Sequence, residues 1–215
     1  MVDLFAERID YRAGHLVEST VPADPYVLFT AWLADAFGAK SQGLLPEPTA
    51  MVVATVDADR PSARTVLLKE VDERGFVFFT NYESRKGREI AAAPQVALLF
   101  GWYPLQRQVR VEGTAAHVPR EESEEYFATR PRGSQLGAWA SRQSTPVPSA
   151  DALAEAYRAV DQRFEGQEVP CPPYWGGYRV TPDSIEFWQG QPSRMHDRLL
   201  YRRGQETWSL QRLAP

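Results

Sequence analysis

Three side chains able to bind anions or transfer protons alternate near the end of the chain. Arg194, His196 and Arg198 stand two residues apart, and in an extended strand such residues point to one face. Two guanidinium groups beside an imidazole repel one another unless an anion or an electron-rich ring lies among them. The imidazole has an ordinary pKa that allows proton transfer near neutral pH. This pattern indicates a site for an anionic or aromatic ligand.

A second basic group stands at the start of a predicted helix. Ser84, Arg85 and Lys86 follow a predicted strand, and the free N–H groups of a first helical turn attract anions. Cations at this end of a helix oppose its dipole, so an anion beside them relieves an unfavourable interaction. The pattern favours a phosphate site. The alternative is a solvated first turn of a surface helix.

Two more sets of residues have side chains that bind anions. Arg64 and Lys69 bracket an apolar stretch; five residues apart, they point to opposite faces of a regular strand and would serve two different anions, or one anion and one ion pair. For this pair alone, ordinary strand-end charges are the simpler interpretation.

Tyr126 and Arg130 share a face of a predicted helix, with Ser134 just beyond it. They could bind a second phosphate or form a polar helix face.

Other familiar kinds of site are not indicated. No cluster of His, Cys and carboxylates has the spacing of metal ligands, and no glycine-rich nucleotide motif is present. His15 and His117 have no charged neighbours in sequence and are interpreted as structural, as is the single Cys171, which lies between prolines without an activating base. The residues indicate a protein that binds anions and a planar group and leaves the chemistry to a cofactor.

The composition fits one domain with a substantial core. The chain has 215 residues, 43% of them hydrophobic and 24% charged, with a formal net charge of -4. Nucleic-acid binding usually needs a basic excess, which is missing. The start of the chain has no apolar signal segment, and no apolar run is long enough to span a membrane. We therefore expect a cytoplasmic protein.

The order of predicted elements favours a mainly β protein with helices. We expect residues 1–23 to form a flexible arm and residues 24–215 a single domain. Asp24 and Pro25 read as the cap and first residue of a helix over 26–40, with Leu28, Trp32, Leu33 and Phe37 on its apolar face. Strands are predicted at 51–56, 64–69, 76–80, 96–100, 106–112, 178–180, 185–189, 199–203 and 207–213, and further helices at 84–93, 120–129 and 150–164. This irregular order indicates an antiparallel β barrel with added helices.

Nine segments, in order, resemble the pyridoxamine 5'-phosphate oxidase family. They are RTVLLK at 64–69, FTNYESRK at 79–86, RQVRVEG at 107–113, YFATRPRGSQLGAW at 126–139, SRQS at 141–144, YWGG at 174–177, IEFWQG at 185–190, RMHDR at 194–198 and RLAP at 212–215. Each segment alone is weak evidence for the family, but the presence of all nine in the family's order is specific.

The resemblance implies an FMN-binding split barrel and a homodimer with FMN at the subunit interface. By position in the motifs, the residues that bind FMN would be Arg64, Val66, Leu67, Phe79, Thr80, Arg85, Lys86, Gln108, Gln143, Ser144, Trp188 and Arg198. Those that bind the phosphorylated substrate would be Lys69, Tyr126, Arg130 and Ser134, with Arg194 and His196 as catalytic residues over its ring and Arg8 and Tyr11 from the arm. The arm departs from the family at LVEST, 16–20, where basic residues are usual.

The activity implied is oxidation of pyridoxamine or pyridoxine 5'-phosphate to pyridoxal 5'-phosphate. The substrate's C4' carbon would pass a hydride to flavin N5, and dioxygen would reoxidise the flavin and leave as hydrogen peroxide. Two alternatives are a related flavin oxidase of phenazine biosynthesis and a non-catalytic protein that binds FMN or pyridoxal phosphate. The presence of Lys69, Tyr126, Arg130, Ser134, Arg194 and His196 together favours the vitamin B6 substrate.

Overall fold

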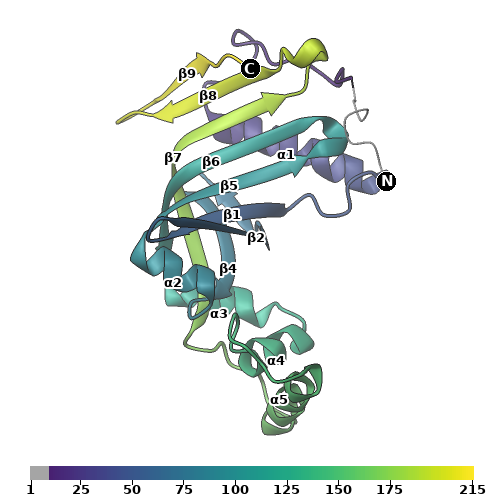
Figure 1. The fold of residues 1–215 in the computed structure, drawn as a ribbon, viewed down its shortest axis with the longest axis vertical. Coiled ribbons are helices and arrows are strands. Elements are labelled where there is room, and N and C mark those ends of the chain that lie inside the picture. Colours follow the sequence, from purple (N-terminus) through teal and green to yellow (C-terminus); the bar gives the residue numbers. More distant parts are fainter. Residues whose placement is uncertain (1–9) are drawn as a thin grey trace.

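The computed structural model describes residues 10–215 as one antiparallel sheet with helices at its edges (Figure 1). The strands are β1 (Ala50–Asp57), β2 (Arg60–Leu67), β3 (Glu70–Asp72), β4 (Gly75–Asn81), β5 (Gln95–Trp102), β6 (Arg107–His117), β7 (Trp175–Gln189), β8 (Asp197–Arg203) and β9 (Trp208–Arg212). The helices are α1 (Pro25–Ser41), α2 (Arg85–Ala92), α3 (Arg120–Ala128), α4 (Arg132–Ala140) and α5 (Ala150–Arg163), with short 3₁₀ turns η1 (Tyr103–Leu105) and η2 (Pro192–Arg194). The predicted antiparallel β fold with helices is confirmed.

The long strand β7 organises the sheet and runs most of the length of the molecule (Figure 1). One of its edges pairs with β6, whereas the other pairs with β4 over its first part and with β8 over its last part. The ladder with β6 shifts register between Glu112 and Gly113, opposite Pro182. A bulge at this point bends the strand. Along the other edge of β7 the sheet is split, because β4 and β8 pair with different parts of this strand.

The sequence-predicted strands at 178–180 and 185–189 are in fact one continuous strand. Proline and aspartate favour turns, and Pro182 and Asp183 lie between the two predicted strands. In the structure Pro182 lies at the bulge, where a missing backbone N–H costs little. The short strand β3 and the helix α4 were not predicted; Gly133 and Gly137 make the α4 sequence a weak helix former.

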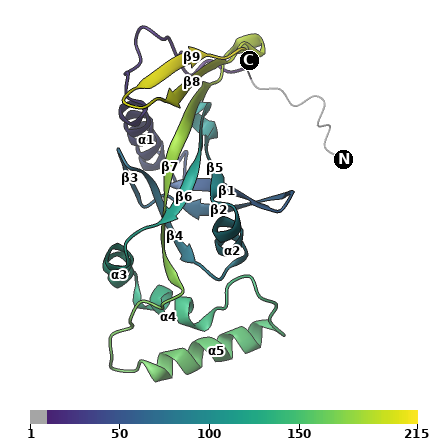
Figure 2. The same ribbon diagram turned by 90° about the vertical axis from the view of Figure 1, so that its left-hand side faces the viewer.

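Helix α1 covers one end of the barrel (Figure 2). The Asp24 side chain accepts a hydrogen bond from the Tyr26 N–H, 2.9 Å away, and Pro25 occupies the first turn, as predicted. Phe29 is fully buried and lies edge-on to Phe76, with ring centroids 4.9 Å apart. The prediction for Phe37 was wrong: this side chain is 44% exposed, and Ala36 takes the buried position.

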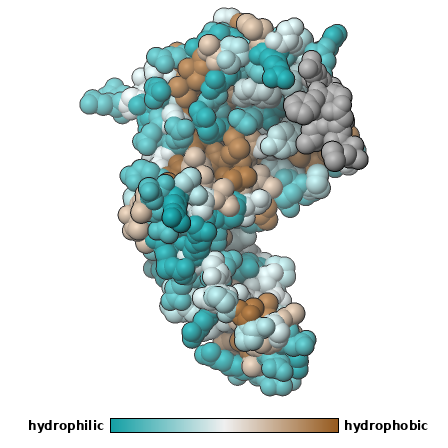
Figure 3. Space-filling model, in the orientation of Figure 1, coloured by the Kyte–Doolittle hydropathy of each residue, from teal (hydrophilic) through white to brown (hydrophobic). Residues whose placement is uncertain are grey.

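Helices α4 and α5 form a separate lobe below the barrel. A second apolar cluster holds this lobe together, with Phe127, Leu136, Phe164, Val169 and Trp175 at its centre. Figure 3 shows the lobe as a narrower extension of the molecule and apolar residues gathered near the middle of the barrel face. Among residues 10–215, no helix is long and apolar enough to cross a membrane.

Candidate active site

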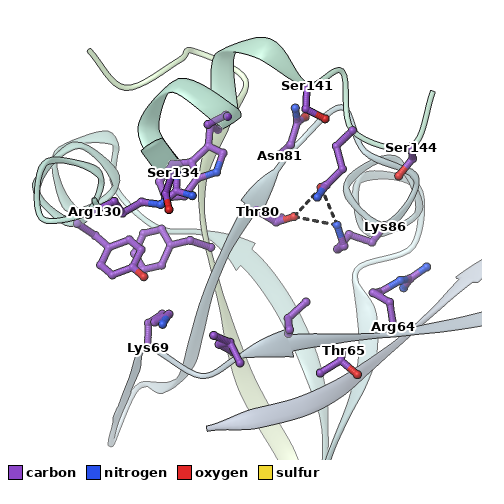
Figure 4. Close-up of a pocket in the computed structure, with 18 of the residues that line it drawn as sticks. Arg64, Thr65, Lys69, Thr80, Asn81, Lys86, Arg130, Ser134, Ser141 and Ser144 are labelled. Carbon is purple, nitrogen blue, oxygen red and sulfur yellow. Dashed lines mark hydrogen bonds between the residues drawn. The ribbon is translucent and has the colours of Figure 1, made fainter. Parts of the chain in front are cut away.

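A cavity of about 1060 Å³ lies between the barrel and the helical lobe (Figure 4). It is lined by most of the residues predicted to bind a cofactor, namely Arg64, Val66, Leu67, Phe79, Thr80, Arg85, Lys86, Gln143 and Ser144. It is also lined by four residues predicted to bind a substrate, Lys69, Tyr126, Arg130 and Ser134. Segments far apart in sequence therefore meet in one cavity.

One end of the cavity is built around a buried lysine. The Lys86 ammonium group donates to Thr80 Oγ1 and to Gln143 Oε1, both at 2.9 Å. Only 8% of Lys86 is exposed. Burial, and then the nearby Arg64 guanidinium, lower the pKa of Lys86 to about 8. An anion at this end would offset both effects, because it would pair with the two cations.

The predicted anion site at the start of the second helix needs a correction at Ser84. This residue is the N-cap of α2, and its hydroxyl accepts from the Gly87 N–H at 3.3 Å. Its oxygen also accepts from the Lys86 ammonium group. Ser84 therefore stabilises the helix start and does not line the cavity, whereas Arg85 and Lys86 do.

The other end of the cavity holds a guanidinium with an unused donor. The Nη1 atom of Arg130 is buried and has no hydrogen-bond partner among the described residues. The Arg130 guanidinium carbon lies 4.7 Å from the ring centroid of Trp175, and burial lowers the pKa of Arg130. Ser134 and Lys69 line the same end of the cavity as Arg130 (Figure 4). These donors fit a second anion, since a buried unpaired donor is costly.

A wall of stacked rings lies beside this second end. Phe79 stacks on Tyr126 with ring centroids 4.1 Å apart and on Trp175 with centroids 5.5 Å apart. The Lys69 ammonium lies 6.0 Å from the Tyr126 ring centroid. Tyr126 belongs to α3, and Arg130 follows the helix end at Ala128. The flat apolar wall suits a planar ligand.

Arg64 and Lys69 do not lie on opposite faces of one strand, as the spacing predicted. Strand β2 ends at Leu67, and the chain then turns so that the Lys69 N–H bonds the Val77 carbonyl at 2.8 Å. Both side chains consequently line the same cavity. Arg64 lies near Lys86 and Lys69 lies on the side of Arg130 (Figure 4), so the inference that the two serve different anions still fits.

A second cluster lies at the far end of β7. Trp188 and His196 have ring centroids 4.7 Å apart. The His196 Nδ1 accepts from the Gln191 N–H at 3.1 Å, so in a neutral ring the proton is on Nε2. Burial, and then Arg194, lower the pKa of His196. The imidazole is therefore neutral at physiological pH and offers a donor at Nε2.

The predicted alternation of Arg194, His196 and Arg198 on one extended strand is wrong. Arg194 ends the η2 turn and has a positive φ of 62°, and β8 begins only at Asp197. Arg198 does not need an anionic ligand, because its Nε donates to Glu186 Oε1 at 2.8 Å. Glu186 is buried and also accepts from Arg110. The strand assumption failed because Pro192 and the left-handed Ser193 form a turn.

The cavity and the second cluster are far apart within one chain. On β7, Gly177 pairs with Phe79 of the cavity, whereas Trp188 pairs with Gln108 and Arg198. Trp188 follows Gly177 by eleven positions, so the two residues are on the order of 30 Å apart along the strand. None of Gln108, Trp188, Arg194, His196 and Arg198 lines the cavity. The predicted site is thus present in two parts.

Part of the amino-terminal segment packs on the second cluster. The Tyr11 ring is edge-on to Trp188, with centroids 5.8 Å apart, and lies 5.6 Å from His196. The N–H groups of Arg12 and Ala13 both donate to Gln106 Oε1. Predicted substrate residue Arg8 lies outside the described residues. Tyr11 therefore stands beside the candidate catalytic histidine.

Several residues of the cavity, and of the network behind it, were not predicted from the sequence. Trp175 completes the aromatic wall, and the buried Glu89 binds both Arg64 and Arg85. Glu89 follows Arg85 by four residues on one helix, and that spacing was a usable signal. Thr55 and Ser62, which surround Glu89, gave no signal because they meet only through strand pairing.

The residues that sequence analysis interpreted as structural lie outside the cavity. His117 stacks on Tyr82, with ring centroids 4.1 Å apart. Cys171 is half-buried, and burial raises the pKa of its thiol, so it is not an activated nucleophile. Within residues 10–215 there is no group of three or more His, Cys, Asp or Glu side chains that could hold a metal ion.

The split barrel, together with a cavity that has cations at both ends and an aromatic wall, defines a class of protein that binds flat, anionic ligands. The chain belongs to the pyridoxamine 5'-phosphate oxidase family. Residues 37–164 match the family described as "Pyridoxamine 5'-phosphate oxidase", and residues 175–215 match its "Pyridoxine 5'-phosphate oxidase C-terminal dimerisation region".

Similar proteins agree with this assignment. A "Pyridoxine/pyridoxamine 5'-phosphate oxidase" from Burkholderia lata is 56% identical over 100% of both chains. One of the same description from Rubrobacter xylanophilus is 57% identical over 99% of this chain and 97% of its own. The crystal structure of PhzG from Burkholderia lata 383, in complex with tetrahydrophenazine-1-carboxylic acid, has a TM-score of 0.85 at 30% identity and covers 94% of this chain and 98% of its own. The predicted family and the predicted split-barrel fold are confirmed.

Proposed function

We propose that this protein is an FMN-dependent oxidase that converts pyridoxamine 5'-phosphate or pyridoxine 5'-phosphate to pyridoxal 5'-phosphate, and that it acts as a homodimer. The observation that carries the proposal is the cavity with two separate cationic ends, of which one contains the buried, unpaired Arg130 Nη1. A phosphorylated cofactor and a phosphorylated substrate in one cavity need two anion sites. The names and high identity of the relatives support the same reaction.

The end of the cavity around Lys86 fits the phosphate of FMN. Arg64 and Lys86 supply charge, and the Thr80 and Ser144 hydroxyls line the adjoining wall. Gln143 reaches the Lys86 ammonium from the segment after α4 and so closes this end. Bound there, FMN would supply the two-electron acceptor that the protein's own side chains lack.

The end around Arg130 fits the phosphate of the substrate. Arg130 and Lys69 provide charge, and Tyr126 and Ser134 provide hydroxyl groups. The stacked Phe79 and Tyr126 rings form an apolar wall on one side of the cavity. In this proposal these side chains bind and orient the substrate, and orientation is the main contribution of the protein to the rate.

A second copy of the chain would complete the site. Trp188 is too far along β7 to reach the cavity of its own chain, and Arg194 and His196 lie beyond the end of that strand. The match of residues 175–215 to a dimerisation region supports an interface there. In the dimer, His196 of the second copy would face the substrate as a neutral donor at Nε2, and Arg194 would add a positive charge. Gln108 and Arg198 would approach the cofactor from the same side.

A flavin oxidase acting on a phenazine precursor is the second candidate. It is favoured by the structural similarity to PhzG, whose crystal structure contains tetrahydrophenazine-1-carboxylic acid. Identity to that protein is 30%, against 56% to the vitamin B6 oxidase of the same organism. The buried Arg130 with Lys69 and Ser134 also provides more donors than a carboxylate needs. We therefore place the vitamin B6 phosphates first.

An anaerobic titration tests the proposed function. The purified protein is loaded with FMN, oxygen is removed, and pyridoxine 5'-phosphate is added while the visible flavin band is recorded. We expect the band to bleach, to recover on admission of air, and to leave pyridoxal 5'-phosphate in solution. Bleaching only with tetrahydrophenazine-1-carboxylic acid would support the second candidate. A flavin band that no substrate bleaches would indicate a non-catalytic flavin-binding protein.

A further inference from the structure

A buried carboxylate lies directly behind the cationic end of the cavity that contains Lys86. Glu89, on α2, is only 4% exposed, and it does not line the cavity. Its Oε2 accepts from Thr55 Oγ1 at 2.5 Å and from Ser62 Oγ at 2.7 Å. A buried carboxylate is costly unless it is paired and hydrogen-bonded, so these partners explain how the group is tolerated.

The same carboxylate binds two arginines that line the cavity. The Arg64 Nη2 donates to Glu89 Oε2 at 2.9 Å, and the Arg85 Nε donates to Glu89 Oε1 at 2.7 Å. Burial alone would raise the pKa of Glu89, but hydrogen bonds from Thr55, Ser62 and both arginines lower it to about 2. Glu89 is therefore ionised at any physiological pH and binds the two arginines as an anion.

Arg64 is fixed by more than one contact. Its Nη1 donates to Thr55 Oγ1, and its Nη2 donates to Ser62 Oγ at 2.6 Å. Both hydroxyls also bond Glu89. The guanidinium thus lies in a closed network in which each member fixes the others, and such networks orient side chains more strongly than isolated pairs do.

The carboxylate also sets the charge of this end of the cavity. Arg64, Arg85 and Lys86 are three cations, and the ionised Glu89 behind them leaves two net positive charges. A phosphate monoester carries roughly 1.5 to 2 negative charges near pH 7. The end of the cavity is therefore matched in charge to one phosphate group.

We propose that Glu89 is a positioning residue for the cofactor phosphate: it fixes the Arg64 and Arg85 guanidinium groups in the orientation that receives the phosphate and balances the charge of that end of the cavity. This inference rests on the proposed FMN site and names a residue outside the cavity that controls it. A carboxylate that competed with phosphate for the two arginines would have the opposite effect, because its removal would tighten phosphate binding. The sign of the change in FMN affinity therefore distinguishes the two roles.

The test compares FMN with riboflavin, which has the same ring and no phosphate. Wild-type apoprotein, Glu89→Gln and Glu89→Ala are each titrated with both flavins, and binding is followed by quenching of flavin fluorescence. Arg88→Ala is the matched control, because Arg88 is an exposed cation on the same helix that bonds the Glu83 carbonyl and not Glu89. Thermal melting of each apoprotein shows whether it is folded, and the near-isosteric Glu89→Gln retains a folded variant if Glu89→Ala does not fold.

We expect both Glu89 variants to raise the Kd for FMN by about tenfold or more, as loss of charge-assisted hydrogen bonds does, with Glu89→Gln less affected. The Kd for riboflavin should stay within about twofold of wild type, and Arg88→Ala should change neither. FMN binding that is unchanged or tighter in the Glu89 variants would overturn the inference. So would equal weakening of both flavins, which indicates a general structural role. Failure of the wild type to bind FMN would contradict the proposed function itself, and this inference with it.

Discussion

The Asp197 carboxylate accepts a hydrogen bond from the Arg212 guanidinium at 2.6 Å, and this ion pair joins distant parts of the chain beside His196. Its other oxygen accepts from the Leu16 N–H at 3.1 Å and from the Gln191 side chain at 2.8 Å. Asp197 directly follows His196 and begins β8. The amino-terminal segment, the loop after β7 and the last strand therefore meet at one carboxylate.

Removal of this carboxylate should loosen the segment next to the histidine. In Asp197→Ala, Arg212, Leu16 and Gln191 each lose an acceptor, which we expect to lower the free energy of unfolding by about 1–3 kcal/mol. The amide of Leu16 should exchange hydrogen faster, and the KM for the substrate should rise more than kcat falls. Asp183→Ala, at an exposed position, is the control. An unchanged exchange rate at Leu16 would show that Asp197 does not anchor the segment.

The unpaired donor of Arg130 leads to a second prediction. Arg130→Ala should lower kcat/KM for the vitamin B6 phosphate by about a hundredfold, since charge-assisted bonds to phosphate are among the strongest in proteins. FMN affinity should change little, because Arg130 lies at the opposite end of the cavity from Lys86 (Figure 4). Arg130→Lys should recover only part of the loss, since lysine lacks the planar fork.

The control for Arg130 is Arg158→Ala, an exposed arginine on α5. Steady-state kinetics and FMN titrations on the three variants separate the two ends of the cavity. Equal losses of FMN affinity and of substrate turnover in Arg130→Ala would contradict the separation into two anion sites.

The lowered pKa of Lys86 predicts how FMN binding depends on pH. Its pKa in the free protein is lowered to about 8 from an ordinary value of 10.5, so the ammonium loses its charge as the pH rises through about 8. A bound phosphate would raise this pKa again. Because Lys86 stays charged below its pKa, FMN affinity should change little between pH 7 and 7.5 and fall by up to about tenfold per pH unit above 8.

The same shift predicts the pH dependence of apoprotein stability, with the opposite sign. The folded state favours neutral Lys86 because its pKa is lowered. The unfavourable contribution of charged Lys86 to the free energy of unfolding is therefore fully present below pH 8 and disappears as the pH rises from 8 to 10.5.

Lys86→Arg, which stays charged, should remove the pH dependence of FMN affinity above pH 8. A wild-type FMN affinity that is flat from pH 7 to 10 would contradict this role for Lys86.

Local patterns predicted the individual elements better than they predicted the geometry of the site. The cap at Asp24 and Pro25 and the helix start at Ser84 were visible because capping depends on neighbouring residues. The alternation of Arg194, His196 and Arg198 led to a wrong prediction of one extended strand, because the left-handed Ser193 turns the chain there. The spacing of residues predicts which side chains share a face only where the backbone keeps the regular geometry of a strand or helix.

Contacts between distant segments could not be predicted from the residues alone. The network of Thr55, Ser62 and Glu89 depends on the register of β1 against β2 and on the packing of α2. Likewise, Phe79 of β4 pairs with Gly177 near the start of β7, whereas Trp188 lies near the end of β7, and this long strand was predicted as two short ones. The resemblance to the family indicated which residues belong to the site. The fold shows that, within one chain, these residues form two groups, the cavity and the cluster around His196.

Mixed dimers test most directly whether the cavity of one protomer and the His196 cluster of its partner form one catalytic site. Arg130→Ala damages the cavity and His196→Ala damages the cluster, so each homodimer should have almost no activity. In a mixed dimer, one site would combine the intact cavity of one chain with the intact cluster of the other. Random pairing of equal amounts should then restore about a quarter of wild-type activity. A mixture as inactive as either variant alone would contradict a site shared between two copies.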